Sequence, residues 1–204
     1  MSEVTIYAMP SSGNTYKVRL LLAHLGRDVR VVKAEAGTPE VAALRDAGKL
    51  PLGSLPVLEL PDGTLIPESN AILCYLADGT PWLPTDPVTR AHVLGWMFWE
   101  QNAHEGCIAV RGALRTYPHR QAEATPDRMA QLLDAGHRAL ARMEGHLTLA
   151  DWLAGAQPTI ADLCLFAYTH RAAHPGGFDM ARFPAVTAWL ARTAALPGHQ
   201  QMDT

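Results

Sequence analysis

The chain changes character near residue 80, and this change constrains its fold more than any other feature of the sequence. Before that point, short β-branched runs alternate with segments whose apolar residues recur at helical spacing. Residues 80–87, Thr-Pro-Trp-Leu-Pro-Thr-Asp-Pro, carry prolines that break a helix. Beyond them the periodicity is almost entirely helical. We therefore expect two domains, residues 1–79 and 88–204, joined by a linker over 80–87.

The first part of the chain predicts a defined order of strands and helices. Strands are expected over 4–9, 29–32, 56–60 and 64–66, and helices over 15–25, 41–47 and 68–77. Pro61-Asp62-Gly63 separates the last two strands and is typical of a hairpin. Because a strand, a helix and a strand connect by a right-handed crossover, the first two strands should be parallel. The order βαβαββα is that of a thioredoxin-like, α/β domain.

The second part predicts an all-α bundle of about five helices. Long periodic segments cover residues 88–114, 126–147, 160–173 and 184–195. Thr159 and Asp162 have the spacing of a capping box at the start of a helix, and we expect them to act in folding rather than in chemistry.

Composition and charge exclude several classes of protein. The 204 residues carry a net charge of −3, which is too weak and too mixed for nucleic acid as the main partner. No apolar run approaches the about 20 residues of a membrane span. Met1-Ser2-Glu3 lacks the features of a signal peptide. Three cysteines, Cys74, Cys107 and Cys164, lie far apart, as expected of free thiols in a cytoplasmic protein.

Four segments carry a family resemblance that spans the chain. They are Ser11-Ser12-Gly13-Asn14-Thr15-Tyr16-Lys17-Val18-Arg19, Leu50-Pro51-Leu52-Gly53-Ser54-Leu55-Pro56-Val57-Leu58, Glu68-Ser69-Asn70-Ala71-Ile72-Leu73-Cys74-Tyr75-Leu76, and Gly155 followed by Thr159-Ile160-Ala161-Asp162. In this order they resemble the cytosolic glutathione S-transferases, in particular bacterial members of the serine type. The sequence departs from the family pattern at Leu50, where Asn is frequent, and at Ser54, where Lys or Gln is frequent.

The resemblance implies an enzyme that binds glutathione and holds its thiol as a thiolate. Ser12 aligns with the catalytic serine, whose hydroxyl would donate a hydrogen bond to the sulfur at the start of a helix. One such bond is worth about 1.5–3 kcal/mol, or roughly one to two pKa units. Alternatively, Ser12 only caps the helix. Ser11 and Asn14 are adjacent candidates, and Tyr7 matches the tyrosine of another branch of the family.

The same resemblance implies a set of glutathione-binding residues. The Leu55-Pro56 peptide bond would be cis and would expose the backbone of Leu55 for pairing with an extended glutathione. Ser69 would receive the γ-glutamyl carboxylate, and Glu68 its ammonium group. Lys49 is a candidate for the glycine carboxylate, while Ser11 and Asn14 complete the set. A plain edge-strand proline and simple helix capping are the alternatives.

The second domain would supply the pocket for a small hydrophobic electrophile. The candidates are Trp99, His104, Ile108 and Arg111 along its first long helix. Aromatic residues at this spacing are also typical of a core or a dimer interface. The resemblance implies a homodimer, with His104 and Arg111 near the substrate or the partner's glutathione, although Gly112 stands where the family's arginine is expected.

No metal is expected, and glutathione is the only cosubstrate implied. His170 and His174 have i, i+4 spacing but lack a third ligand. The turn at Ser12 has no cysteine and the chain has no Cys-x-x-Cys, which argues against thioredoxin or glutaredoxin activity. The expected function is glutathione transfer in detoxification. Peroxide reduction, dehalogenation, isomerisation and a non-catalytic regulatory role on the same scaffold are the alternatives.

Overall fold

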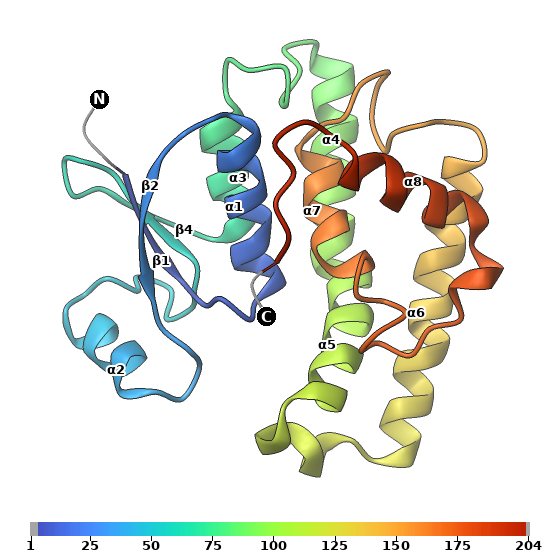
Figure 1. The fold of residues 1–204 in the computed structure, drawn as a ribbon, viewed down its shortest axis with the longest axis horizontal. Helices are drawn as coiled ribbons and strands as arrows, with labels where there is room; N and C mark the ends of the chain where they lie inside the picture. Colours follow the sequence, from blue (N-terminus) through green and yellow to red (C-terminus); the bar gives the residue numbers. More distant parts are fainter. Residues whose placement is uncertain (1–3, 203–204) are drawn as a thin grey trace. The chain divides into compact units, whose positions relative to one another are not determined.

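A computed structural model describes residues 4–202 (Figure 1). Residues 1–3, on which the signal-peptide argument rests, and residues 203–204 lie outside the described part. The chain divides into two units between Thr80 and Pro81, at the beginning of the expected linker. The segment that starts at Pro197 groups with the first unit and not with the helical domain expected over 88–204.

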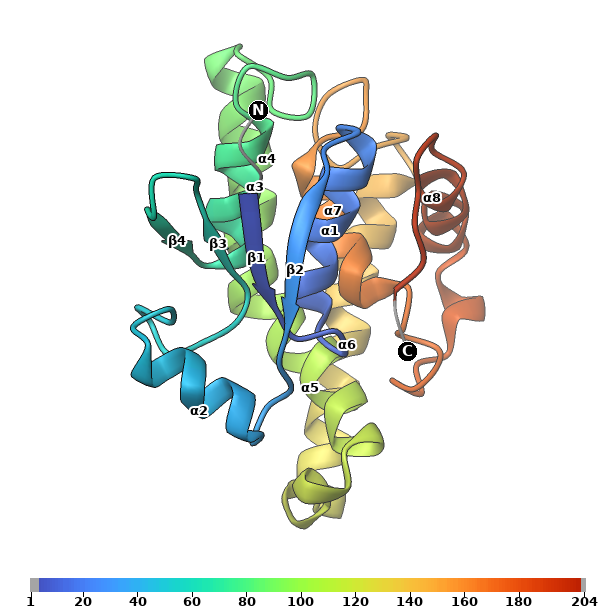
Figure 2. The ribbon, with the colours of Figure 1, turned by 60° about the vertical axis from the view of Figure 1, so that its left-hand side comes forward.

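The first unit contains a four-stranded mixed sheet in the order β2-β1-β3-β4. Its strands are β1 (Val4–Ala8), β2 (Val29–Lys33), β3 (Val57–Glu59) and β4 (Leu65–Pro67). β1 pairs in parallel with β2, while β3 pairs antiparallel with both β1 and β4 (Figure 2). The expected parallel pair and the hairpin are therefore present.

The first unit also contains three helices: α1 (Gly13–His24), α2 (Pro39–Asp46) and α3 (Ser69–Ala77). α1 and α3 pack against each other on one face (Figure 2). On α2, Val41 and Leu44 pack against a separate cluster formed by Tyr7, Leu50 and Val57. The element order is βαβαββα, which confirms the thioredoxin-like fold expected from the sequence.

The second unit is all helical, as expected. Its helices are α4 (Pro87–Trp99), α5 (Glu105–Thr116), α6 (Pro126–Leu147), α7 (Ile160–Thr169) and α8 (Pro184–Ala194). The single helix predicted over 88–114 is interrupted by a π-helical segment, Glu100–His104. Short 3-10 turns, Pro118–Glu123 and Met180–Arg182, were not predicted. α7 is the core of this unit, since nine of its ten residues are buried.

The longest helix, α6, shows how local signals determine where a helix begins. The Thr125 side chain accepts a hydrogen bond from the Arg128 amide, and Pro126 occupies the first helical position. The buried residues of α6 include Leu140 and Met143. Among residues 4–202, no helix is both long enough and apolar enough to cross a membrane.

The capping box at the start of α7 is present as predicted and is extended by a tryptophan. The Asp162 carboxylate, fully buried, accepts hydrogen bonds from the amides of Thr159 (2.9 Å) and Leu153 (3.0 Å) and from Trp189 Nε1 (2.9 Å). Burial raises the pKa of Asp162, and these donors act in the opposite direction. One carboxylate therefore joins α7, α8 and the preceding loop.

Candidate functional site

Ser12 occupies the turn between β1 and α1 and caps the helix. Its amide donates to the Met9 carbonyl (2.9 Å), and its hydroxyl oxygen accepts from the Asn14 amide (3.2 Å). The residue is 8% exposed. Within residues 4–202, the Ser12 hydroxyl proton has no hydrogen-bond acceptor. Ser12 can thus cap α1 through its oxygen and still donate its proton to a ligand.

Ser11, the adjacent candidate, is held by a carboxylate that sequence analysis missed. Its amide donates to Glu35 Oε1 (3.0 Å), and its hydroxyl donates to Glu35 Oε2 (2.7 Å). Glu35 follows β2 and is 24 residues away from Ser11. The carboxyl ends of parallel strands meet at one edge of a sheet, and an acid just beyond the second strand was the signal available.

A hydrogen bond connects the beginnings of two helices. The Ser69 hydroxyl donates to Asn14 Oδ1 over 3.1 Å, and Ser69 is only 5% exposed. Asn14 lies in the first turn of α1, and Ser69 is the first residue of α3. Helix N-termini carry partial positive charge, so the two helices together create a favourable place for anionic groups.

Glu68 precedes α3 and has an unusual backbone conformation. With φ of 68° it is the one non-glycine residue with positive φ between residues 4 and 202. Such a conformation costs about 1–3 kcal/mol and is found preferentially at functional sites. The Glu68 side chain is exposed, and its carboxylate has no hydrogen-bond or ion-pair partner in the described part of the chain.

The Leu55-Pro56 peptide bond is cis, as the resemblance implied. It directly precedes β3, whose first residue, Val57, pairs with Tyr7 of β1. The segment that contains Leu55 therefore adjoins the strand that leads to Ser12.

Tyr7 and Lys49 share the carboxylate of Glu59. The Tyr7 hydroxyl donates to Glu59 Oε2, and Lys49 Nζ lies 2.6 Å from Glu59 Oε1. Burial and the contact with Glu59 raise the pKa of Tyr7. The hydrogen bond from Lys49 lowers the pKa of Glu59. This geometry directs the Tyr7 proton and the Lys49 ammonium group to Glu59, not to a sulfur or a glycine carboxylate.

The candidate pocket residues of the second unit lie mainly in its interior. His104 is fully buried, with Nε2 2.9 Å from Thr169 Oγ1, and Ile108 is 2% exposed. Arg111 donates from Nε to the Gly176 carbonyl (2.9 Å) and from its guanidinium to the Met129 carbonyl. Trp99 is half-buried and makes an edge contact with Trp96. For His104, Ile108 and Arg111, these contacts favour a structural role.

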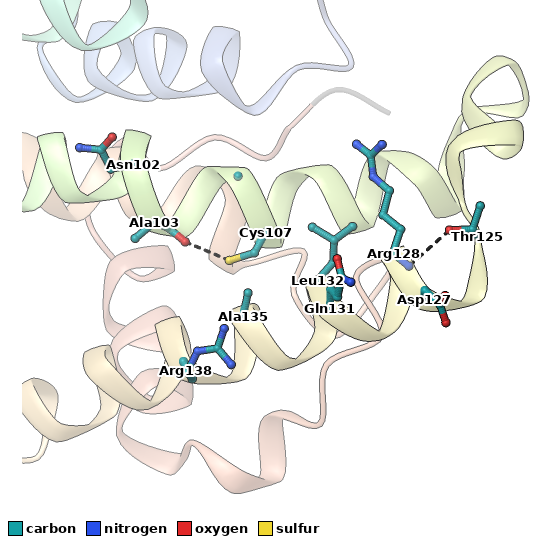
Figure 3. A pocket seen from close by; sticks show the side chains of 11 residues that line it. Asn102, Ala103, Cys107, Thr125, Asp127, Arg128, Gln131, Leu132, Ala135 and Arg138 are labelled. Carbon is teal, nitrogen blue, oxygen red and sulfur yellow. Dashed lines mark hydrogen bonds between the residues drawn. The ribbon is translucent and has the colours of Figure 1, made fainter.

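A hollow of about 790 Å³ lies between α5 and α6 (Figure 3). The Cys107 thiol donates to the Ala103 carbonyl, and burial raises the pKa of this thiol. It is therefore not activated as a nucleophile. The four candidate pocket residues do not line this hollow, which is formed by Asn102, Ala103, Gly106, Cys107, Thr125, Asp127, Arg128, Gln131, Leu132, Ala135 and Arg138.

Of the two histidines considered for a metal, His170 makes its described contacts with Phe166. His170 Nδ1 lies 2.9 Å from the Phe166 carbonyl, and its ring stacks on Phe166. Across residues 4–202, no group of three or more histidine, cysteine, aspartate or glutamate residues is arranged to hold a metal ion.

Comparison with known proteins identifies the family. Residues 2–78 match the model of the glutathione S-transferase N-terminal domain, and residues 126–192 match that of the glutathione S-transferase C-terminal domain. The chain belongs to the glutathione S-transferase family.

Individual glutathione S-transferase relatives align over nearly the whole chain. The glutathione S-transferase-like protein LUC7 of a Fusarium species is 30% identical over 92% of this chain and 87% of its own. The maleylacetoacetate isomerase of Rhizobium meliloti is 28% identical over 98% and 95%, respectively. The crystal structure of a glutathione S-transferase from Xanthobacter autotrophicus is 44% identical, with a TM-score of 0.91 over 98% of this chain and 97% of that one.

In this member of the family, the candidate residues of the first unit are connected through acids that the motifs do not include. Glu35 holds Ser11, and Glu59 holds Tyr7 and Lys49. Ser12, Asn14 and Ser69 lie together where α1 and α3 begin.

Proposed function

We propose that this protein is a glutathione transferase of the serine type, in which Ser12 donates a hydrogen bond to the glutathione thiolate. The observation that carries the proposal is the buried Ser12 hydroxyl, which has no acceptor among residues 4–202, at the start of α1. The hydroxyls of Ser11 and Tyr7 are engaged by Glu35 and Glu59. One hydrogen bond to a thiolate lowers its pKa by roughly one to two units, enough to populate it near neutral pH.

The contacts around Ser12 also support the binding of the glutathione peptide. Asn14 and Ser69 connect two helix N-termini that favour negative charge, and we assign the γ-glutamyl carboxylate to Ser69. Glu68, whose carboxylate has no partner among the described residues, would receive the ammonium group. The Leu55 backbone beside Pro56 would pair with the extended peptide.

The proposed reaction is attack of the thiolate on a small hydrophobic electrophile. A carbon–sulfur bond forms, and with an aryl halide the halide leaves with the bonding electron pair. Ser12 holds the nucleophile in its charged form, and binding supplies orientation. The half-buried Trp99 is the candidate that we retain for the electrophile pocket, and the buried His104 ring lies beside it. Ile108 and Arg111 would stabilise the helical unit without contact with the electrophile. The proposal extends to a cytoplasmic homodimer that acts in detoxification.

A second candidate function is glutathione-dependent isomerisation. The 28% identity to the maleylacetoacetate isomerase, over 98% of this chain, favours it. The same thiolate would add to a carbon of a double bond conjugated to a carbonyl, and the displaced electron pair would move onto the carbonyl oxygen. After rotation about the resulting single bond, return of this electron pair would re-form the double bond and expel the thiolate. Glutathione is regenerated in this sequence, so the requirement for Ser12 is unchanged.

The proposal is tested by retention on immobilised glutathione and by turnover of an aryl halide and of maleylacetoacetate. We expect Ser12→Ala to raise the pKa of the bound thiol by roughly one to two units. kcat/KM at neutral pH should fall about 10- to 100-fold. Thr125→Ala, which removes the hydroxyl that caps α6, is the matched control and should leave turnover unchanged.

Absence of both retention and turnover in the wild-type protein would favour a non-catalytic regulatory role. Retention with turnover that does not depend on Ser12 would assign the thiol contact to another group.

A further inference from the structure

We propose that Glu35 is a positioning residue, whose carboxylate holds the β1–α1 turn so that the Ser12 hydroxyl faces the glutathione sulfur. This inference rests on the proposed function of Ser12. Glu35 lies outside the four segments that carry the family resemblance. It would affect the reacting sulfur only indirectly, by holding the turn that contains Ser12.

Both oxygens of the Glu35 carboxylate accept hydrogen bonds from the same residue, Ser11. Oε1 accepts from the Ser11 amide at 3.0 Å, and Oε2 accepts from the Ser11 hydroxyl at 2.7 Å. Hydrogen bonds to an ionised acceptor are stronger than neutral ones, and a bidentate pair also restricts rotation. Ser11 is therefore held in both position and orientation.

Ser11 transmits this restraint directly to Ser12, its neighbour in the chain. The turn is also closed by the Ser12 amide, which donates to the Met9 carbonyl, and by the Met9 amide, which donates to Thr15 Oγ1. These contacts lie within one stretch of chain, whereas the contact with Glu35 attaches the turn to the end of β2. A carboxylate from a second strand thus supplements the local hydrogen bonds.

The backbone around Glu35 is itself fixed. The Ala34 amide donates to the Ala8 carbonyl at 2.9 Å, which extends the parallel β1–β2 ladder up to the residue before Glu35. The Glu35 carbonyl accepts from the Thr38 amide at 3.2 Å, where the chain turns into α2. Since Ala34 is buried and both flanking bonds are made, the carboxylate projects from a restrained backbone.

A carboxylate near a developing thiolate has an electrostatic disadvantage. Like charges raise the pKa of a neighbouring acid, so Glu35 by charge alone would disfavour the ionised thiol. Removal of this charge would then lower the pKa of the bound thiol. Loss of positioning would raise that pKa, because Ser12 would no longer be aimed at the sulfur. The sign of the change therefore distinguishes the two effects.

The test compares Glu35→Gln and Glu35→Ala with the wild-type protein in complex with glutathione. The pKa of the bound thiol is measured from thiolate absorbance against pH, and kcat/KM for an aryl halide is measured over the same range. We expect the pKa to rise by about half a unit to one unit and kcat/KM at neutral pH to fall about threefold to tenfold. Glu35→Gln should show the smaller change, because one acceptor oxygen remains.

Ser11→Ala provides a second route that leaves the carboxylate in place. It removes one of the two donors and should shift the thiol pKa in the same direction. Combined with Glu35→Gln, its effect should be less than additive, since both changes remove the same contact. Glu40→Gln, which removes an exposed carboxylate in the first turn of α2, is the matched control and should change neither quantity.

Two results would overturn the role of Glu35 while the proposed function stands. These are a lower thiol pKa in the Glu35 variants, or an unchanged pKa with only a loss of thermal stability. If the wild-type protein fails to lower the thiol pKa, or if Ser12→Ala has no effect on it, the proposed function fails and the inference about Glu35 fails with it.

Discussion

At the residue scale, three hydroxyl groups on or beside the end of β1 differ in whether they donate a hydrogen bond, and to which acceptor. Tyr7 donates to Glu59 and Ser11 donates to Glu35. Ser12 accepts a hydrogen bond from Asn14, and its own proton has no acceptor among residues 4–202. A hydroxyl that is already bonded to a carboxylate must lose that bond before it can serve a ligand. Ser12 is therefore the hydroxyl that can bind a sulfur at the smallest energetic cost.

The ion pair between Lys49 and Glu59 leads to a prediction about glutathione recognition. We expect Lys49→Met to raise KM by no more than about fivefold, because an ion pair that water can reach contributes little to stability or to binding. The increase should be the same for glutathione and for its glycine ethyl ester, since Lys49 contacts Glu59 and not the glycine carboxylate. KM is measured for both thiols, with Lys33→Met as a control.

If the increase in KM occurs with the free acid alone, Lys49 contacts the glycine carboxylate directly. Glu59→Gln provides an independent check, because it should reproduce the uniform increase if the ion pair acts only through local structure.

The sequence could name the candidate residues but not choose among them. Ser12, Glu68 and Ser69 lie in recognisable segments, so short-range patterns were sufficient to find them. The partners that distinguish Ser12 from Ser11 and Tyr7 lie 24 and 52 residues away in the sequence. Such pairs form only when strands align, and no local pattern encodes the register that brings Glu35 or Glu59 into contact.

At the element scale, the sequence predicted most helices but missed the π-helical segment Glu100–His104. Apolar periodicity identifies a helix by its buried face, and this stretch reads Glu-Gln-Asn-Ala-His. A π-helical turn adds a residue to one turn of a helix, which apolar periodicity does not register. Here Glu100 and His104, two polar residues, are fully buried. A method that identifies helices from the spacing of apolar residues does not detect buried polar residues such as these.

The capping box of α7 leads to a prediction about stability. We expect Asp162→Ala to lower the free energy of unfolding by about 2–4 kcal/mol, because three buried donors lose their acceptor. Chemical denaturation measures this loss. Thr125→Ala, which removes one exposed cap, should cost only about 1 kcal/mol. A loss for Asp162→Ala no larger than this control would contradict the structural account of the extended box.

At the scale of the whole molecule, the chain returns to its first unit after the helical unit is complete. The Tyr16 hydroxyl donates to the Gln200 carbonyl at 2.7 Å, and His24 Nδ1 lies 2.8 Å from the Pro197 carbonyl. Gly198 between them has φ of 82°, and a Cβ there would lie 3.3 Å from the Ala23 carbonyl. The segment from Pro197 thus runs alongside α1 (Figure 1).

This contact predicts a specific loss of stability at high pH. Burial raises the pKa of Tyr16 to about 12, whereas an unfolded chain has a tyrosine pKa of about 10. The unfolded state therefore releases the proton first, and the stabilisation is lost as pH rises from about 10 to about 12. Tyr16→Phe should lower stability by about 1 kcal/mol at neutral pH and flatten the alkaline decline.

Denaturation midpoints measured against pH for the wild-type and Tyr16→Phe proteins test this expectation. Tyr117→Phe provides the comparison at a tyrosine of the helical unit. Identical alkaline declines in the wild-type and Tyr16→Phe proteins would contradict the assignment to Tyr16.

The division into two units could be read from the prolines after residue 80, but the return of the chain could not. The residues from Pro197 to Met202, Pro-Gly-His-Gln-Gln-Met, have neither helical nor strand periodicity. Their contact with Tyr16 spans 184 positions. A contact between residues so far apart depends on how all the intervening helices and strands pack, and this packing cannot be predicted from local sequence patterns.

The same return imposes an order on biosynthesis. A ribosome releases β1, α1 and the rest of the sheet long before it has translated the residues that lie along α1. Until then Tyr16 and His24 lack these neighbours, and a nascent chain presents that side of α1 to solvent or to chaperones. The helix that Ser12 caps thus acquires its last neighbours in the first unit only after the entire helical unit has been made.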